Sequence, residues 1–282
     1  MTTRAPRRRA RRTGHTLAKA LAVAGVLLFT LFPAYFMVVS AASVRTTSGT
    51  DALLPDALTL DSFRYVLFDA GFLTYLGNSL YVALVTVAGS SLLALFAAVA
   101  VARFRFRLRT TVLLMVLVVQ MVPLEALVIP LFLQVRDLQM LNTLLGLSIV
   151  YIALSLPFAI WMLRGFVAAV PVDVEEAAYI DGASWGRMFW SVLLPLVAPG
   201  LVATAIFSFI TAWNEFILAL TFLNEDDKFT VAVGLRQFYG QFTTDWASVM
   251  AASTVVTLPV MVFFLLVQRG LAAGLVQGAV KG

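Results

Sequence analysis

The stretch EEAAYIDGASWGRMFWSVLLP, from Glu175 to Pro195, interrupts a strongly apolar chain with acids, an arginine, a central glycine and a closing proline. Asp173, followed three residues later by a glutamate, has the spacing of a helix-capping box. Gly182 suits a break that needs a left-handed or closely packed backbone, and a proline suits the first turn of a following helix. The pattern predicts a hairpin of two short helices over residues 171–195.

The composition is that of an integral membrane protein. The 282 residues are 61% hydrophobic and 12% charged, whereas globular domains are nearer half apolar and a quarter charged. The chain has no cysteine and one histidine, His15, which excludes disulfides, thiolate or multi-histidine metal sites and a Ser–His pair at membrane depth. It also lacks a G-x-x-x-x-G-K-[ST] phosphate loop, so ATP hydrolysis of the usual P-loop kind is not expected on this chain.

Six apolar segments are long enough to cross a hydrocarbon layer of about 30 Å, which takes about 20 helical residues. We therefore expect an all-α, polytopic fold. The first segment is longer than the core of a signal peptide, about 7–15 residues, which predicts an uncleaved helix. The predicted spans are 17–42, 76–102, 111–134, 144–163, 196–221 and 248–268.

The distribution of basic residues predicts the orientation of these spans. With the N-terminus inside, 15 of the 20 Lys and Arg residues fall on the cytoplasmic side, as the positive-inside rule requires. We expect both termini in the cytoplasm, with a basic arm over 1–16, a six-helix membrane domain over 17–268 and a tail over 269–282. The arginines of the arm are interpreted as holding the first helix at the membrane surface, not as a nucleic-acid site.

The predicted hairpin departs from this charge pattern. It lies inside, yet the loop holds only Arg164 and Arg187 against four acidic residues. This favours a protein partner for the hairpin. The alternative is an amphipathic hairpin that lies in the membrane interface and is anchored by its aromatic residues.

The hairpin resembles the cytoplasmic EAA signature of permease subunits in ABC importers. That signature reads E-A-A, three residues, Gly, nine residues, an aliphatic residue, any residue, Leu-Pro. It matches here at Glu176, Ala177, Ala178, Gly182, Val192, Leu194 and Pro195. Valine stands where isoleucine is commonest. Five further stretches resemble the smaller, six-helix permease of carbohydrate importers of the maltose type: NSLYVAL from Asn78, AVARFRF to Phe106, LNTLLGL from Leu141, AWNEFILAL from Ala212 and the tail AGLVQGAVKG.

The resemblance implies the type I ABC importer permease fold and a place in the bacterial cytoplasmic membrane. In that family the hairpin is the coupling helix, which sits in a groove of an ATP-binding subunit. It implies coupling roles for Glu175, Glu176, Ala177, Ala178, Asp181, Gly182, Ala183, Phe189 and Pro195. The tail residues Gly278, Lys281 and Gly282 would also contact the ATPase pair, or else form a frayed end.

The resemblance also implies the partners. These are a second homologous permease, two P-loop ATPase subunits and an extracytoplasmic solute-binding protein or lipoprotein, with membrane lipid around the helices and no nucleic acid. ATP and Mg²⁺ would be held by the ATPase subunits, so no cofactor and no enzymatic activity are expected on this chain.

Polar residues within the predicted spans are candidates for a substrate pathway. An acid at a helix centre costs about 2.5–3.5 kcal/mol on insertion scales. For Glu125 and Glu215 this cost has to be offset by hydration, by partners or by protonation. Together with Asn214 they could bond sugar hydroxyls, and Trp213 could stack on a sugar face. The alternative is polar contact between helices. Gln120 is open to either interpretation.

The sequence thus predicts a permease subunit of an ATP-driven importer for a sugar or oligosaccharide. One alternative is the same machine for glycerol phosphate or another small polar solute; the carbohydrate-type matches argue against a polyamine. An ion-driven secondary carrier is a second alternative, although paired inverted halves are not evident. A membrane enzyme is the third, and no catalytic constellation supports it.

Overall fold

The structure is a computed structural model that describes the backbone of residues 7–43, 57–240 and 244–279, and the side chains of these residues except 7–18 and 269–279. Contacts within the chain form two compact units. The first comprises residues 1–70 and 238–255, and the second 71–237 and 256–282.

The first unit contains the N-terminal helix. Helix α1 runs from Arg7 to Ala41, and its apolar part, Lys19–Ala41, is long enough to span a membrane. The predicted first span is therefore helical, and the helix extends into the predicted basic arm. A short helix α2 (Asp61–Arg64) continues into a π-helical turn, Tyr65–Asp69.

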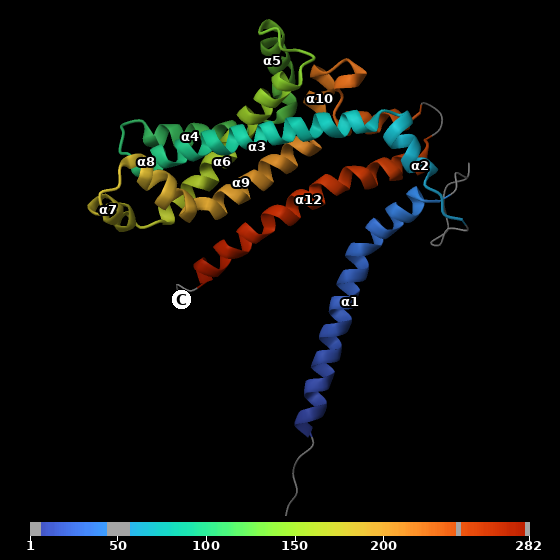
Figure 1. The fold of residues 1–282 in the computed structure, drawn as a ribbon, viewed down its shortest axis with the longest axis horizontal. Coiled ribbons are helices and arrows are strands. Elements are labelled where there is room, and N and C mark those ends of the chain that lie inside the picture. Colours follow the sequence, from blue (N-terminus) through green and yellow to red (C-terminus); the bar gives the residue numbers. More distant parts are fainter. Residues whose placement is uncertain (1–6, 44–56, 241–243, 280–282) are drawn as a thin grey trace, which may run out of the picture. The chain divides into compact units, whose positions relative to one another are not determined.

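Three long helices form the scaffold of the second unit: α3 (Phe72–Arg103), α6 (Leu144–Ala169) and α9 (Leu194–Asn214). They lie alongside one another in Figure 1. Within a hydrocarbon layer a helix satisfies all its backbone hydrogen bonds internally, so long apolar runs fold this way. The start of α6 is set locally, because the Thr143 hydroxyl accepts a hydrogen bond of 3.0 Å from the Gly146 N–H.

Small residues let these helices approach closely. Lipid is as apolar as leucine, so helix association in a membrane depends on close packing and on interhelical hydrogen bonds. The hydroxyls of Ser90 on α3 and Ser208 on α9 are 3.0 Å apart and hydrogen-bonded. One cluster of the core lies near the end of α3 and joins three segments of chain. Its members are Ala94, Leu95, Ala98, Val99, Ala159, Leu163, Val167, Val170, Met188, Phe189, Leu193 and Val197.

The third predicted span, 111–134, is not one straight helix. It is divided into α4 (Arg109–Val119) and α5 (Leu124–Asp137), which meet at an angle of 103°. Pro123 stands at the bend. Proline has no N–H to donate and disfavours a helical conformation of the residue before it, which explains why the helix breaks here.

The fifth predicted span, 196–221, is wrong at both ends. The membrane helix already begins at Trp185 and ends at Asn214, and a separate helix α10 covers Ile217–Phe222. The sixth span lies within α12 (Trp246–Ala279). Within the described ranges, five helices are long and apolar enough to cross a membrane, and the bent α4–α5 pair makes up to six. The predicted all-α polytopic class is confirmed.

The loop after α10 is held to its surroundings by an asparagine. Asn142 has a left-handed backbone (φ +56°), and its N–H donates to the Phe222 carbonyl at 2.8 Å. Its side-chain oxygen accepts hydrogen bonds from the N–H groups of Asn224 and Glu225. Farther along this loop, a hydrogen bond from Lys228 lowers the pKa of the Glu225 carboxyl, so the loop keeps its acidic character.

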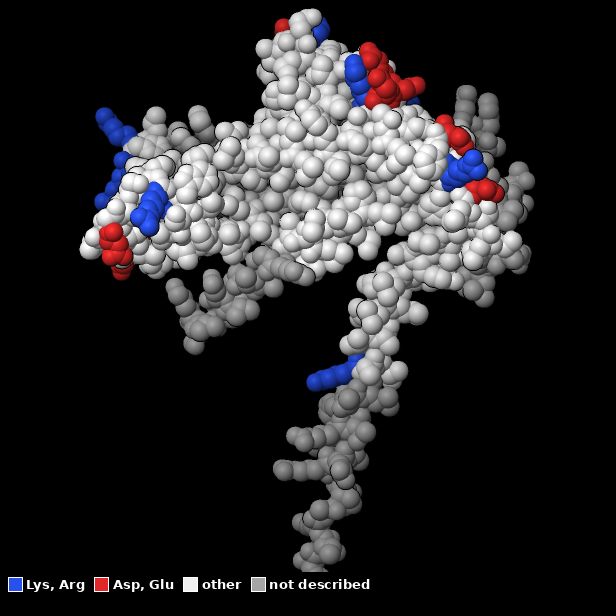
Figure 2. Space-filling model, viewed as in Figure 1, with Lys and Arg blue, Asp and Glu red and all other residues white. Residues whose placement is uncertain are grey.

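Charged side chains are unevenly distributed on the second unit. Figure 2 shows them at the end that carries α7 (Val172–Ile180) and α8 (Trp185–Met188), and again beside α10 and at the tip of α5, with an uncharged surface between. An uncharged band between charged ends is the arrangement expected of helices that cross a hydrocarbon layer.

The contact between α9 and α6 yields a stability prediction. A Cβ added at Gly200 would lie 2.5 Å from Cγ and 2.9 Å from Cβ of Phe166, atoms close to the backbone that cannot swing away. We expect Gly200→Ala to lower the unfolding free energy by about 1–3 kcal/mol, as overpacking does. Thermal unfolding in detergent measures it.

Gly165→Ala is the matched control, because the space around that glycine is open. It should leave the melting temperature unchanged or raise it slightly through helix propensity. Equal melting temperatures for the two variants would contradict the close contact.

Candidate functional site

The first helix of the hairpin, α7, begins at Val172, two residues earlier than a cap at Asp173 would require. Pro171 precedes the helix with an extended backbone, and no side chain caps its N-terminus. Asp173 therefore lies inside the first turn, and its prediction as the capping residue is wrong. Its carboxylate still favours this position, because an acid is stabilised near a helix N-terminus.

The turn of the hairpin is set by Gly182, which has φ +82°. The Gly182 N–H donates to the Tyr179 carbonyl at 3.0 Å, and the Ala183 N–H donates to the Ala178 carbonyl at 2.9 Å. These two bonds form the Schellman motif that ends helices at a left-handed residue. No atom lies within 4 Å of a Cβ placed at Gly182, so glycine is required by the backbone angle and not by crowding. The predicted left-handed break is confirmed.

The second helix of the hairpin is not separate from the membrane span. Helix α8 starts after Ser184, whose hydroxyl accepts a hydrogen bond from the Arg187 N–H. A π-helical turn, Phe189–Leu193, then leads directly into α9. Pro195 follows this turn and lacks an N–H, and a π turn accommodates the missing hydrogen bond without ending the helix. The hairpin is thereby rigidly continuous with a helix of the scaffold.

The predicted coupling residues divide into an exposed group and a buried group. The exposed or half-exposed members are Glu176, Ala177, Ala178, Asp181, Gly182, Ala183 and Pro195, whereas Glu175 and Phe189 are buried. Phe189 stacks on Phe96 of α3, with ring centroids 5.4 Å apart, and so fixes the base of the hairpin. The exposed group is on the surface and open to a partner.

Exposed apolar side chains extend this surface. Ile180, at the tip of α7, is 86% exposed, and Tyr179 and Trp185 beside it are also exposed. Large apolar groups exposed together outside the lipid-facing helices mark an interaction surface. These three residues were not among those predicted for the site; the signal that could have found them was an isoleucine two residues before the breaking glycine.

Glu175 is paired inside the protein. Its Oε1 lies 2.7 Å from Nε of Arg103, the last residue of α3, and both side chains are largely buried. Nη2 of the same guanidinium donates to the Val170 carbonyl at 2.9 Å. One arginine thus joins the ends of α3 and α6 to the first turn of α7. The sequence analysis did not single out Arg103.

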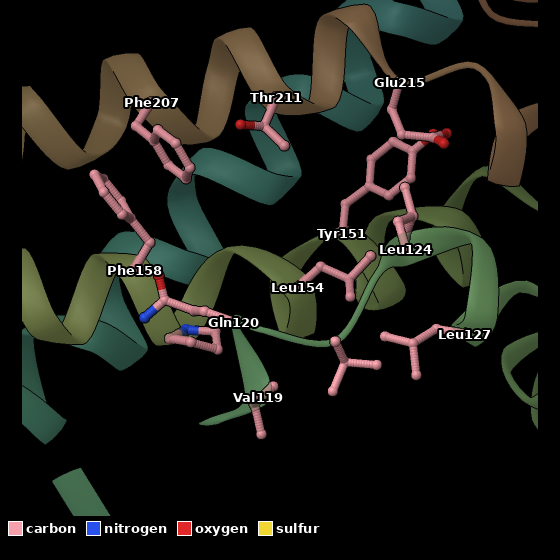
Figure 3. Close-up of a pocket in the computed structure, with 12 residues that line it drawn as sticks. Val119, Gln120, Leu124, Leu127, Tyr151, Leu154, Phe158, Phe207, Thr211 and Glu215 are labelled. Carbon is pink, nitrogen blue, oxygen red and sulfur yellow. The ribbon is translucent and has the colours of Figure 1, made fainter. Parts of the chain in front are cut away.

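A cavity of about 250 Å³ lies between the α4–α5 bend, α6 and α9 (Figure 3). Four polar side chains reach it: Gln120, Tyr151, Thr211 and Glu215. The rest of the lining is apolar, formed by Val119, Val122, Leu124, Leu127, Leu154, Pro157, Phe158 and Phe207. The last two rings stack with centroids 3.8 Å apart. An apolar pocket with a few converging polar groups is the usual form of a small-molecule site.

Glu215 also has a structural role at the edge of this cavity. Its carboxylate accepts hydrogen bonds from the N–H groups of Leu218 (2.8 Å) and Ala219 (3.1 Å), at the start of α10. It also accepts one from the Tyr151 hydroxyl on α6. The first two bonds satisfy backbone N–H groups left free where α10 begins. The three hydrogen-bond donors compensate the carboxylate, which explains how an acid can lie at membrane depth here.

The other predicted pathway residues do not line this cavity. Trp213 is 2% exposed and stacks on Phe209. The side-chain amide of Asn214 donates to the Ile210 carbonyl of its own helix. Glu125 is exposed in the first turn of α5. Their roles in a pathway stay predictions, as do those of the tail: Gly278 lies in α12, and residues 281 and 282 lie outside the described residues.

Comparison with known proteins identifies the family. Residues 90–277 match the family described as "Binding-protein-dependent transport system inner membrane component". The chain belongs to this family. It is therefore a multi-pass permease component of a transport system in a bacterial inner membrane.

Curated relatives of this permease cover nearly its whole length. It is 39% identical over 264 residues to the diacetylchitobiose uptake system permease protein DasC of Streptomyces coelicolor, covering 92% of this chain and 96% of that protein. It is 38% identical over 273 residues to the trehalose/maltose transport system permease protein MalG of Thermococcus litoralis, covering 94% and 98%. The predicted resemblance to carbohydrate-importer permeases of the maltose type is confirmed.

A solved structure shares the fold. A chain of a bacterial ABC transporter involved in the import of the acidic polysaccharide alginate matches with a TM-score of 0.76. The match covers 95% of this permease and 99% of that chain at 21% identity. The predicted importer permease fold is confirmed.

The hairpin geometry yields a prediction about the turn. We expect Gly182→Val to break the two Schellman hydrogen bonds, because a β-branched residue in the left-handed region costs at least about 1–2 kcal/mol. Amide hydrogen exchange of the detergent-purified permease should show faster exchange over residues 177–185.

Gly186→Val is the control, since this glycine lies in α8 with open space around it and no positive φ. It should leave exchange at Gly182 and Ala183 unchanged. Slow exchange at those two amides in Gly182→Val would mean that the left-handed turn is not needed.

Proposed function

We propose that this permease is a membrane subunit of an ATP-driven importer for a sugar or oligosaccharide. The observation that carries the proposal is the exposed hairpin around Gly182, continuous with α9 and tied to α3, in a chain of the binding-protein-dependent transport family. Relatives whose names specify diacetylchitobiose or trehalose and maltose support a sugar as the substrate.

The proposed partners follow from this role. Two P-loop ATPase subunits, which hold ATP and Mg²⁺, receive the hairpin; a second permease completes the pathway; and an extracytoplasmic binding protein delivers the sugar. The hairpin side is the cytoplasmic side, since the positive-inside count assigns it there together with both termini. Among the hairpin residues, the exposed group docks on the ATPase and the buried group fixes the hairpin to the bundle.

The proposed mechanism is alternating access driven from the hairpin. ATP binding closes the ATPase pair and displaces residues 175–191. Because the hairpin runs without a break into α9, this displacement moves the helix that forms one wall of the cavity. The cavity then opens outward, and ATP hydrolysis returns it to its starting arrangement. Two discrete arrangements of packed helices are the usual basis of such a switch.

The cavity is the proposed part of the sugar pathway on this chain. The hydroxyls and amide of Tyr151, Thr211 and Gln120 can exchange hydrogen bonds with sugar hydroxyls, and the rings of Phe158 and Phe207 present an apolar surface to the faces of the sugar. The second permease closes the open side. Glu125, Trp213 and Asn214 contribute, if at all, from outside this cavity.

The cavity disfavours one alternative substrate. None of the described residues that line it is Lys or Arg, and one is a glutamate. A phosphate ester such as glycerol phosphate would meet no positive charge there and would pay the cost of a desolvated anion. An uncharged polyol fits these groups better.

Co-purification tests the proposed machine. The tagged permease, extracted in mild detergent from its native host, should bring down a P-loop ATPase, a second permease and a sugar-binding protein, identified by mass spectrometry. Gly182→Val should lose the ATPase while still inserting in the membrane, and Gly186→Val should keep it. Recovery of the permease alone, with uptake that needs no nucleotide, would establish an ion-driven carrier instead; turnover unrelated to transport would indicate an enzyme.

The polar groups of the cavity yield a prediction on affinity. Thr211→Val keeps the shape and removes a hydroxyl, so the sugar concentration for half-maximal uptake should rise about 2–10-fold, the equivalent of one hydrogen bond of about 0.5–1.5 kcal/mol. Uptake of labelled diacetylchitobiose and trehalose by the reconstituted transporter measures it.

Two further variants separate binding from structure. Thr204→Val, on the same helix but bonded to carbonyls of its own turn, should leave the affinity unchanged. Glu215→Gln should lower thermal stability, because it weakens the bonds to α10 and Tyr151. An unchanged affinity in Thr211→Val would remove the cavity from the pathway.

A further inference from the structure

We propose that α3 is a rigid rod that carries movement between the ATPase-docking hairpin at one of its ends and the acidic loop after α10 at the other. This rests on the proposed function, which assigns the two ends to opposite sides of the membrane. Arg103 is the positioning residue at the hairpin end, and Asn78 is its counterpart at the loop end.

The hairpin end of the rod is an ion pair shielded from water. The exposed fractions of the side chains are 14% for Arg103 and 9% for Glu175. Breaking a largely buried ion pair costs far more than breaking one on the surface, because it leaves an uncompensated charge in the protein. Since the same guanidinium also bonds the Val170 carbonyl, a displacement of α7 cannot leave the end of α3 behind without losing both contacts.

The loop end of the rod is held by hydrogen bonds to the backbone. The side-chain amide of Asn78 donates to the carbonyls of Asp227 (2.8 Å) and Phe229 (2.9 Å). Two residues farther into the loop, the N–H of Val231 donates to the buried hydroxyl of Ser79 at 2.8 Å. Residues near the start of α3 therefore hold the loop by its main chain, so the loop must follow the helix.

The loop itself has the character of a docking surface. Asn224, Glu225, Asp226 and Asp227 are exposed, and Lys228 bonds back to Glu225. On the outer side of the membrane, an acidic surface of this kind suits a soluble, sugar-loaded binding protein with basic residues at its contact.

Between its two ends α3 has the properties of a rod. It runs unbroken for 32 residues, about 48 Å at 1.5 Å per residue. It contains no proline, whereas α6 and α9 beside it contain Pro157 and Pro199, and prolines are the commonest cause of helix kinks. It contains two glycines. Gly77 lies in open space beside Asn78, and Gly89, in the middle of the helix, is packed against Ile152 of α6 next to the hydrogen bond from Ser90 to α9.

The consequence is a coupling that works in both directions. If ATPase closure shifts the loop through α3, then docking of the binding protein on the loop must shift the hairpin with the same free energy, by thermodynamic linkage. A path of this kind is established only by coupling measured between its ends.

The experiment uses nitroxide labels on single cysteines, which the chain allows because it has no cysteine of its own. One label replaces Asp226 in the loop and the other Ser191 beside the hairpin; both positions are exposed. In the complete transporter, reconstituted in lipid nanodiscs, Mg²⁺ and a non-hydrolysable ATP analogue are added and the spectra are recorded. Both labels should respond in the otherwise wild-type protein.

Variants then cut the rod at either end. In Arg103→Met the loop label should lose at least four-fifths of its response while the hairpin label keeps its own. The exchange Arg103→Glu with Glu175→Arg re-forms the ion pair with reversed charges, although not the bond to Val170, and should restore at least half of the loop response, whereas Arg103→Glu alone should not. Asn78→Leu should silence the loop label alone. Arg105→Met, at an exposed arginine two positions after Arg103, should leave the response of both labels unchanged.

The outcomes separate the two levels of the proposal. Silence of the hairpin label in the unaltered transporter would contradict the proposed function. A responsive hairpin with a full loop response in either Arg103→Met or Asn78→Leu would overturn the rod and leave the function standing. If Arg103→Met silences both labels, Asn78→Leu decides: loss of the loop response supports the rod, and its retention overturns it.

Discussion

Every backbone polar group inside a hydrocarbon layer has to find its partner within the protein, and two irregular points along the α9 span show how this permease meets that requirement. The α9–α10 break is closed by the carboxylate of Glu215, which accepts two of the N–H groups at the start of α10. The proline at 195 is absorbed by a π turn that keeps the helix continuous. The turn of the hairpin, where the chain leaves the helical conformation, lies among charged residues at the end of the bundle.

This constraint divides the polar residues into two kinds. Side chains such as Glu215, Asn142 and Ser90 are bonded within the protein and hold breaks, loops and helix pairs in place. Thr211 instead presents its hydroxyl to a cavity that is otherwise lined mainly by apolar side chains, and Gln120 reaches the same cavity while its amide donates to the Val116 carbonyl of its own helix. The distinction matters for interpreting variants, because a residue of the first kind affects transport through the fold and one of the second kind through the substrate.

Much of this arrangement could be predicted from the sequence, for physical reasons. Long apolar runs have one stable structure in a membrane, so the helical spans and the class of fold were predictable, as was the left-handed glycine at the hairpin turn. The break at Pro123 was not predicted, because a proline in a membrane helix can be tolerated or can bend it, and the outcome depends on its neighbours. The break after Asn214 was not predicted either, because it depends on the hydrogen bonds that Glu215 accepts from the start of α10. The pairing of Arg103 with Glu175 joins residues 72 positions apart, and no local pattern reveals it. The cavity likewise depends on how α4, α5, α6 and α9 pack. Of the four residues predicted for the pathway only Glu215 lines it, together with Gln120, for which either interpretation was open.

The turn at Gly182 has a consequence for how the hairpin meets another protein. Its shape is set by a backbone angle and two main-chain hydrogen bonds, with no neighbouring side chain near the glycine. A turn of this kind keeps its conformation whether or not a partner is present, so association requires little loss of conformational entropy. The few side chains at the tip of the hairpin, Ile180 foremost, can then change the affinity for a partner without disturbing the turn that carries them.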